Sequence, residues 1–167
     1  MPFLPGKNSS PRVLGLFMVF AVLIFDQASK LLLLDFMDGG KAQGVAVTSF
    51  FNLVLVWNRG VSFGMLSGAE QVMPYALSAL ALLITAFLTR WMMKTGRPCL
   101  GATLGLVIGG ALGNVIDRLR FGAVVDFADF HLAAWHWPAF NVADSAISIG
   151  VGLLLIDSLL PSKEKKP

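Results

Sequence analysis

The segment CLGATLGLVIGGALGNVIDR (residues 99–118) decides how this chain folds. Apart from its last two residues the segment is uncharged, and a helix needs roughly 20 apolar residues to cross about 30 Å of hydrocarbon. Gly101, Gly105, Gly109 and Gly113 recur at every fourth position, so they share one helical face. Small residues on such a face let another helix approach closely. The segment therefore predicts a transmembrane helix packed tightly against a neighbour.

The composition of the whole chain is that of a membrane protein. Of its 167 residues, 56% are hydrophobic and 14% are charged, whereas a soluble domain has roughly 45–50% apolar and about 25% charged residues. The mean hydropathy of +0.73 also excludes a disordered chain. The net charge of +3 comes from basic residues that mostly flank apolar runs, which argues against a nucleic-acid partner. The one cysteine, Cys99, cannot form an intramolecular disulfide, and no Cys/His spacing indicates a zinc site.

Four segments are apolar enough to be transmembrane helices, and we expect one integral-membrane domain over residues 1–167. The first segment could instead be a cleaved signal peptide, because Lys7 and Arg12 precede a short apolar run. Four leucines continue the apolar pattern beyond Asp26, however, and no convincing small-x-small cleavage site follows. This favours a retained helix. The predicted helices span residues 13–34, 71–93, 99–119 and 141–160.

The positions of lysine and arginine predict the orientation of these helices. Eight of the thirteen basic residues fall in the two tails and in the connection between the second and third helices. Four spans place all three regions on one side, and an excess of positive charge marks the cytoplasmic side. Both termini are therefore expected in the cytoplasm. The eight residues are Lys7, Arg12, Arg90, Lys94, Arg97, Lys163, Lys165 and Lys166.

The two loops on the other side, at about 35–70 and 120–140, carry structure of their own. Residues 45–57 are rich in Val, Phe and Thr and predict one or two short strands. Trp135, Trp137 and Phe140 suit an aromatic belt at the membrane surface. The fold class is therefore membrane all-α with a small β element: a four-transmembrane-helix bundle with an outward-facing β platform and loop.

Two aspartates at the outer membrane boundary are the candidates for chemistry. Asp126 follows the third helix in an apolar run, and Asp144 lies in the first turn of the fourth. Two adjacent carboxylates share a proton, so that one can activate water while the other protonates or polarises a carbonyl. This is the logic of an aspartic peptidase, and it needs no metal. For Asp144, a capping box with Asn141 is an alternative explanation.

Other polar residues near the helix ends allow both structural and functional interpretations. Asp26 and Lys30 are four residues apart in the first helix, so they form either a functional pair within the membrane or an interfacial structural pair. Asn114 and Arg118 continue the glycine face, although Arg118 could simply extend to the interface beside Asp117. Asp117 itself is assigned no role.

Histidines leave one further alternative open. His131 and His136 lie near Asp126 and Asp129, which would permit a metal cluster, but histidines among tryptophans at an interface are more often surface residues.

Taken together, five segments in this order resemble the bacterial lipoprotein signal peptidases, also called signal peptidase II. They are DQASK (26–30), NRGVSF (58–63), GGALGNVIDR (109–118), VDF (125–127) and FNVADS (140–145). The resemblance implies an integral-membrane aspartic peptidase with Asp126 and Asp144 as its catalytic dyad, no cofactor and no metal. It also implies a set of residues that bind substrate or support the site: Asp26, Lys30, Asn58, Gly60, Asn114, Arg118, Asn141 and Ala143.

The same resemblance implies the substrate and the location. The substrates would be diacylglyceryl-modified prolipoproteins, cut N-terminal to the lipidated cysteine. The protein would be a monomer in the lipid of the bacterial inner membrane, with its active site at the outer face. The alternative is a small proton-coupled transporter that uses Asp26, Asp126 and Asp144 as a proton relay.

Overall fold

The computed structural model describes residues 10–37, 44–60 and 72–160. Within these residues it contains four helices and four strands, with the following bounds: α1 (Pro11–Phe36), β1 (Gly44–Ala46), β2 (Phe51–Asn58), α2 (Met73–Lys94), α3 (Pro98–Phe121), β3 (Val124–Leu132), β4 (Trp135–His136) and α4 (Val142–Leu159). The start of the second predicted helix at residue 71, residues 61–63 of the second motif, Lys7 and the three C-terminal lysines lie outside the described residues.

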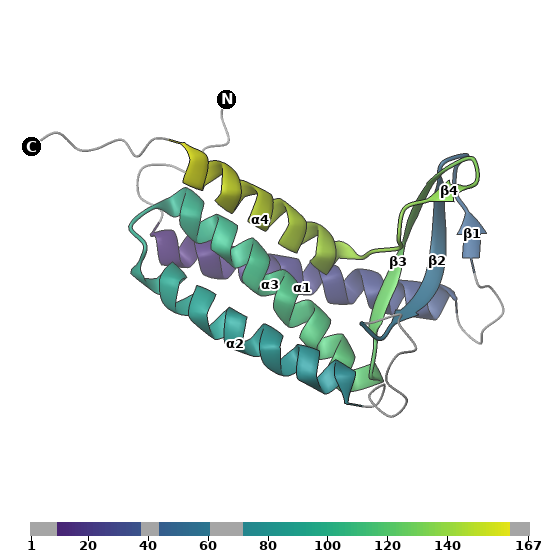
Figure 1. Cartoon of the computed structure of the whole chain (residues 1–167), viewed down its shortest axis with the longest axis horizontal. Helices are drawn as coiled ribbons and strands as arrows, with labels where there is room; N and C mark the ends of the chain where they lie inside the picture. Colours follow the sequence, from purple (N-terminus) through teal and green to yellow (C-terminus); the bar gives the residue numbers. More distant parts are fainter. Residues whose placement is uncertain (1–9, 38–43, 61–71, 161–167) are drawn as a thin grey trace, which may run out of the picture.

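The helices form a bundle with the small sheet at one end (Figure 1). All four are long and apolar enough to cross a membrane, which confirms the predicted fold class. Large apolar side chains on α1, α2 and α4 point away from the bundle, and a soluble protein rarely exposes so much apolar surface. We therefore expect these side chains to face lipid. Examples are Phe17, Phe20, Ile24, Leu83, Phe87, Leu155 and Leu159.

α3 is the central helix and contacts each of the other three. In its most apolar stretch 67% of the residues are buried, against 28% or fewer in the other helices. A Cβ atom on Gly105 would collide with the carbonyl oxygen of Gly15 in α1. A Cβ on Gly110 would collide with that of Ala143 in α4. The glycines of α3 therefore bring two helices into backbone contact, as the sequence predicts.

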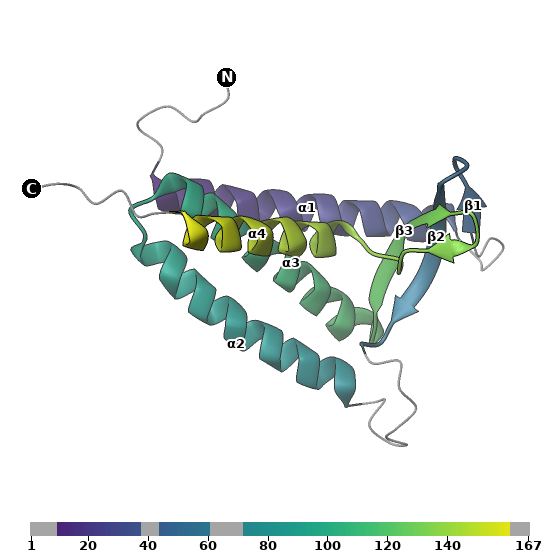
Figure 2. The same ribbon diagram turned by 45° about the horizontal axis from the view of Figure 1, so that its top comes forward.

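The sheet is antiparallel, in the order β1-β2-β3-β4. β2 pairs along β3, from Asn58 opposite Val124 to Phe51 opposite Phe130, with an irregularity between Leu53 and Val56. α3 leads almost directly into β3, because Gly122 ends the helix in the left-handed conformation at φ 68°. The turned view in Figure 2 shows β3 and β2 crossing the end of the bundle beside the start of α4.

Within the predicted outer loop over 120–140 the structure has a strand that the sequence pattern does not indicate, β3, which is the longest strand of the sheet. The first three residues of β3, Val124, Val125 and Asp126, are all buried. A strand buried on both faces lacks the alternation of apolar and polar residues by which a half-buried strand is recognised. Residues 45–57 do form strands, β1 and most of β2.

Candidate active site

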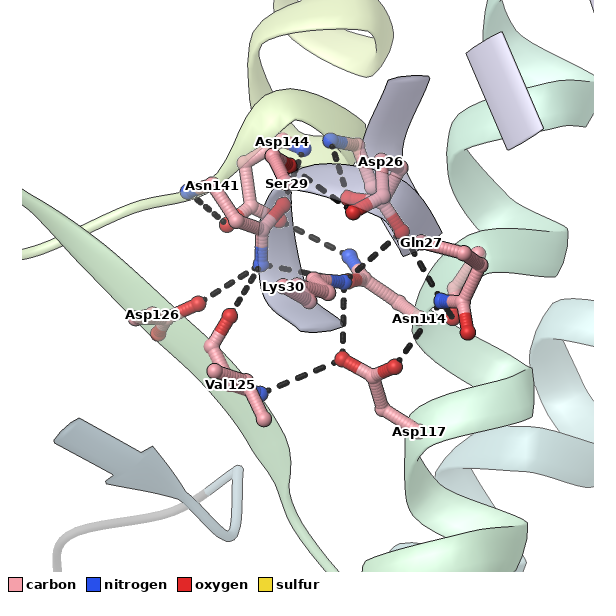
Figure 3. A network of polar contacts seen from close by, with 12 residues as sticks. Asp26, Gln27, Ser29, Lys30, Asn114, Asp117, Val125, Asp126, Asn141 and Asp144 are labelled. Atoms are coloured by element: carbon pink, nitrogen blue, oxygen red, sulfur yellow. Dashed lines mark hydrogen bonds and ion pairs between the residues drawn. The ribbon is translucent and has the colours of Figure 1, made fainter. Parts of the chain in front are cut away.

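The two candidate catalytic aspartates lie at the sheet end of the bundle and are joined by one amide. Asp126 is the third residue of β3 and is 2% exposed; Asp144, partly exposed, is in the first turn of α4. Asn141 Nδ2 donates to Asp126 Oδ1 at 2.7 Å, and Asn141 Oδ1 accepts from the Asp144 backbone N–H at 2.9 Å. Figure 3 shows Asn141 between them. The structure therefore brings the two aspartates together as the sequence predicts.

The predicted capping box is also present. The side chain of Asp144 accepts from the backbone N–H of Asn141 at 3.3 Å through Oδ2, while Asn141 caps Asp144 in return. Oδ1 of Asp144, however, accepts a hydrogen bond from Asn114 Nδ2 of α3 at 2.8 Å. Capping therefore accounts for one oxygen of Asp144 only, and the other is bound by Asn114 of α3.

Asn58 holds the opposite side of Asp126. It is the last residue of β2, and its Nδ2 donates to Asp126 Oδ2 at 2.9 Å. Its Oδ1 accepts the N–H of Gly60 at 2.9 Å, which fixes the amide orientation. Gly60 has φ +107°, a conformation that side chains rarely adopt. Gly60 thus supports the site through the turn that orients Asn58.

The surroundings of Asp126 favour retention of a proton. Burial is the largest influence, and the pKa of Asp126 is raised to about 6. The Asn58 amide opposes the increase and the negative charge of Asp144 adds to it, while the Asn141 amide and the Lys30 ammonium favour the charged form. A carboxyl group with a raised pKa beside a second carboxylate can hold and transfer a proton near neutral pH.

α3 contributes two of the expected supporting residues, in different ways. Asn114 links Asp144 to Lys30, whose Nζ lies 3.3 Å from Asn114 Oδ1. Arg118, on the same face, is partly buried, and its Nε has no hydrogen-bond partner among the described residues. It is not paired with Asp117, whose oxygens contact Lys30, Gln27 and the Val125 backbone.

Beneath the aspartates lies a group we call the ion cluster: Asp26, Gln27 and Lys30 of α1 with Asp117 of α3. Lys30 Nζ lies 2.8 Å from Asp26 Oδ2 and 2.7 Å from Asp117 Oδ2. Gln27 Nε2 donates to both carboxylates, at 3.1 and 3.0 Å. The three charged side chains are no more than 2% exposed, so the pair of Asp26 and Lys30 is buried between α1 and α3 rather than facing lipid.

Ala143 enters the site through its backbone. Its N–H donates to Asp26 Oδ1 at 2.9 Å, and its small side chain is fully buried. All ten residues expected at the site therefore lie at the sheet end of the bundle, although Gly60 acts through Asn58.

Sequence reasoning missed two residues of this region, Asp117 and Gln27. The sequence indicates no role for Asp117, yet its Oδ2 accepts the backbone N–H of Val125 at 3.2 Å, next to Asp126. The only signal in the sequence is the spacing of Gln27 and Lys30 on the first helix and of Asn114 and Asp117 on the third, each three apart on one helical face.

The two histidines lie farther along the sheet and interact with each other. Their rings stack with centroids 4.9 Å apart. Asn52 donates to the Asp129 carboxylate at 2.8 Å and His136 Nδ1 pairs with it at 2.9 Å. These two contacts hold the pKa of Asp129 below its usual value. Within the described ranges no group of three His, Cys, Asp or Glu side chains could hold a metal ion.

Comparisons with known proteins agree with this geometry. Residues 18–160 match the family described as signal peptidase (SPase) II. The lipoprotein signal peptidase of Burkholderia cenocepacia J2315 is 50% identical over 156 residues, which are 93% of this chain and 92% of that protein. The lipoprotein signal peptidase of Burkholderia vietnamiensis G4 is 48% identical over the same shares.

Solved structures agree as well. A bacterial membrane enzyme structure at 2.3 Å resolution superposes with a TM-score of 0.75 and 32% identity, covering 91% of each chain. A second, at 1.9 Å resolution, has the same TM-score and 30% identity, covering 89% of this chain and 94% of the other. The four-helix bundle, the aspartates at its sheet end and these matches lead to one conclusion: the chain belongs to the signal peptidase II family of lipoprotein signal peptidases.

Proposed function

We propose that Asp126 and Asp144 are the catalytic dyad of this aspartic endopeptidase, which removes signal peptides from prolipoproteins. The observation that carries the proposal is the single amide of Asn141 that contacts both residues, at 2.7 and 2.9 Å. That amide ties the Asp126 carboxyl group of β3 to the backbone of Asp144 in α4, and we infer that the two carboxyl groups act on the same peptide bond.

The chemistry follows from the two carboxyl groups. One carboxylate takes a proton from a water molecule, whose oxygen attacks the scissile carbonyl carbon, while the protonated partner donates to the carbonyl oxygen. The tetrahedral intermediate then collapses: the leaving nitrogen receives a proton, the C–N bond breaks and a new carboxyl terminus forms. The raised pKa of Asp126 keeps a proton available to the dyad at a higher pH than an ordinary aspartate would.

For the substrate, we propose prolipoproteins that already carry diacylglycerol on the cysteine, cut on the N-terminal side of that residue. The apolar faces of α1, α2 and α4 lead to the sheet end of the bundle. Acyl chains can therefore stay in lipid while the peptide reaches the aspartates, and we expect a monomer to suffice for this.

For the location, we propose the bacterial inner membrane, with both termini in the cytoplasm and the dyad at the outer face. α1 begins, α2 ends, α3 begins and α4 ends at the end of the bundle opposite the sheet (Figure 1). Arg12, Arg90, Lys94 and Arg97 all lie at that end of their helices, as cytoplasmic residues do.

The transporter alternative finds no support in the arrangement of the acids. The buried aspartates of the described residues, Asp26, Asp117, Asp126 and Asp129, all lie at the sheet end. Asp157, at the other end, pairs with Arg97 and is partly exposed. A relay needs titratable groups across the bilayer.

The test is cleavage of a diacylglyceryl-modified precursor by purified enzyme in lipid. Asp126→Asn and Asp144→Asn should each abolish cleavage while the protein still inserts and folds, because an amide is less costly to bury than an unpaired carboxylate. Asp129→Asn is the matched control, since it makes the same change three residues farther along β3. If Asp144 were only a capping residue, Asp144→Asn would lose about 1 kcal/mol of stability and keep its activity; that result would refute the dyad.

A further inference from the structure

The two aspartates of the dyad share a feature of their backbones. The residue before each one donates its N–H to a second, buried carboxylate. Val125, before Asp126, donates to Asp117 Oδ2 at 3.2 Å, and Ala143, before Asp144, donates to Asp26 Oδ1 at 2.9 Å. β3 and the start of α4 are thus each attached to one carboxylate of the ion cluster, right beside the dyad.

The two carboxylates are in turn tied to each other twice. Lys30 Nζ contacts Asp26 at 2.8 Å and Asp117 at 2.7 Å. Gln27 Nε2 donates to the same pair at 3.1 and 3.0 Å. Figure 3 shows the resulting chain of contacts from Val125 through Asp117, Lys30 and Asp26 toward the start of α4.

We propose that the ion cluster is a brace that sets the separation of Asp126 and Asp144, and that Asp117 and Gln27 are positioning residues for the reaction. The proposal rests on the dyad described above. Asp117 and Asp26 have matching roles, one for each catalytic residue, and Lys30 and Gln27 fix the distance between them.

The position of the brace predicts an effect on the catalytic rate rather than on substrate binding. Its residues lie beneath the dyad, and its charged members are no more than 2% exposed, so they are not placed to contact a peptide. The dyad must act on one water and one carbonyl at once, and a misplacement of about 1 Å can cost roughly 100-fold in rate. A loosened brace should therefore lower kcat and leave KM nearly unchanged.

The decisive variants are Asp117→Asn and Gln27→Met, with Asp129→Asn as the control on the same strand. Cleavage of the lipidated precursor is measured per folded enzyme, with the folded fraction taken from thermal unfolding in lipid. We expect Asp117→Asn to lower kcat at least about tenfold with KM changed less than about threefold. Gln27→Met should lower kcat several-fold, and Asp129→Asn should match the wild type.

A pH profile separates positioning from general loss of structure. Asp126 faces Asp144 of α4, Lys30 of α1 and Arg118 of α3. Asp117→Asn removes one of the two negative charges that compensate Lys30, so the ammonium should lower the pKa of Asp126 and move the corresponding limb of the kcat/KM profile to lower pH. Gln27→Met changes no charge and should leave the limb in place.

Three results would overturn the brace. The first is a kcat for Asp117→Asn equal to that of the control. The second is a loss expressed mainly in KM. The third is Gln27→Met with wild-type kcat, which decides the matter even if Asp117→Asn does not fold. Because the wild type must cleave in the same assay, failure of the brace is distinguishable from failure of the proposed function.

Discussion

At the scale of the residue, Asn141 shows how one side chain can serve both structure and chemistry. It begins α4 through the capping box and also donates to Asp126 across the site. The capping box is therefore compatible with the proposed dyad, because the same side chain that caps α4 also fixes Asp144 relative to Asp126. Asn58 donates to the other oxygen of Asp126 and so fixes that carboxyl group from the β2 side.

Asn58→Ala should shift the pH dependence of the reaction upward. The Asn58 amide donates to Asp126 Oδ2 and favours the charged carboxylate, so its removal should raise the pKa of Asp126 above about 6. The limb of the kcat/KM profile that reports Asp126 should then move to higher pH. Asn52→Ala is the control, because it removes the same kind of amide on β2 from Asp129 instead. An equal shift in both variants would contradict the assignment.

At the scale of the element, the glycines of α3 set the positions of the site residues, because they determine how closely α1 and α4 approach α3. Gly110 faces the backbone of Ala143, and Gly113 faces Asp26, whose Oδ2 would lie 2.5 Å from a Cβ at that position. The same helix then delivers Asn114 and Asp117 one turn later. Close helix packing and the contacts to the proposed dyad are thus properties of one continuous face of α3.

Gly110→Ala should destabilise the protein and impair the site. The new Cβ would meet the Ala143 carbonyl and would lie 2.8 Å from Ile147 Cγ1, so the start of α4 must move away from α3. Overpacking of this kind costs about 1–3 kcal/mol, and the displaced segment carries Asp144. We expect a lower Tm in lipid and a lower kcat.

Gly152→Ala is the matched control for that change. It also adds one methyl group to a helix glycine, but nothing lies within 4 Å of the new Cβ. Its Tm and activity should equal or slightly exceed those of the wild type, since alanine favours helix. Equal losses in both variants would show that the contact between α3 and α4 does not position Asp144.

The elements differ in how far the sequence predicts them. The helices are predictable because length and hydropathy are local properties, and the box at Asn141 and Asp144 is predictable because its partners are three residues apart. β3 is not, because Val124, Val125 and Asp126 are buried in succession and give no alternating pattern. Asp117 is missed for another reason: its partners come from the first helix and from a strand, and no local pattern marks a long-range contact.

At the scale of the whole molecule, the chain is polarised along the axis of the bundle. The sheet, the dyad and the ion cluster occupy one end, while Arg12, Arg90, Lys94 and Arg97 occupy the other. The apolar surfaces of the helices lie between them. This polarity leads to two predictions, one about the orientation of the protein in the membrane and one about the lipidation of its substrate.

Cysteine labelling should report opposite sides of the membrane for the two ends. With Cys99, an exposed free cysteine, changed to serine, we expect Thr95→Cys to react only from the cytoplasmic side and Trp135→Cys only from the outer side. The reagent is a membrane-impermeant maleimide applied to intact and to opened cells. Reaction of both positions from one side would refute the four-span topology.

Lipidation of the precursor should dominate its recognition. Each buried CH₂ group contributes about 0.8 kcal/mol to membrane binding, so two acyl chains hold the peptide at the bilayer surface where the dyad is proposed to lie. An unlipidated precursor of the same sequence should be cleaved far more slowly at equal concentration. Equal kcat/KM for the two forms would exclude entry from the lipid.

The ion cluster also constrains the order in which the helices can assemble in the membrane. Gln27 and Asp117 are 90 residues apart in the chain, and ribosomes add about 5–20 residues per second, so roughly 5–18 s separate their synthesis. During that interval the nascent first helix has no partner from the third, although Asp and Lys each cost about 2.5–3.5 kcal/mol at the centre of an inserting helix. Only the ion pair within α1 and its place toward one end of the helix reduce that cost. We therefore expect the first helix to complete its buried polar contacts only after the third has been synthesised.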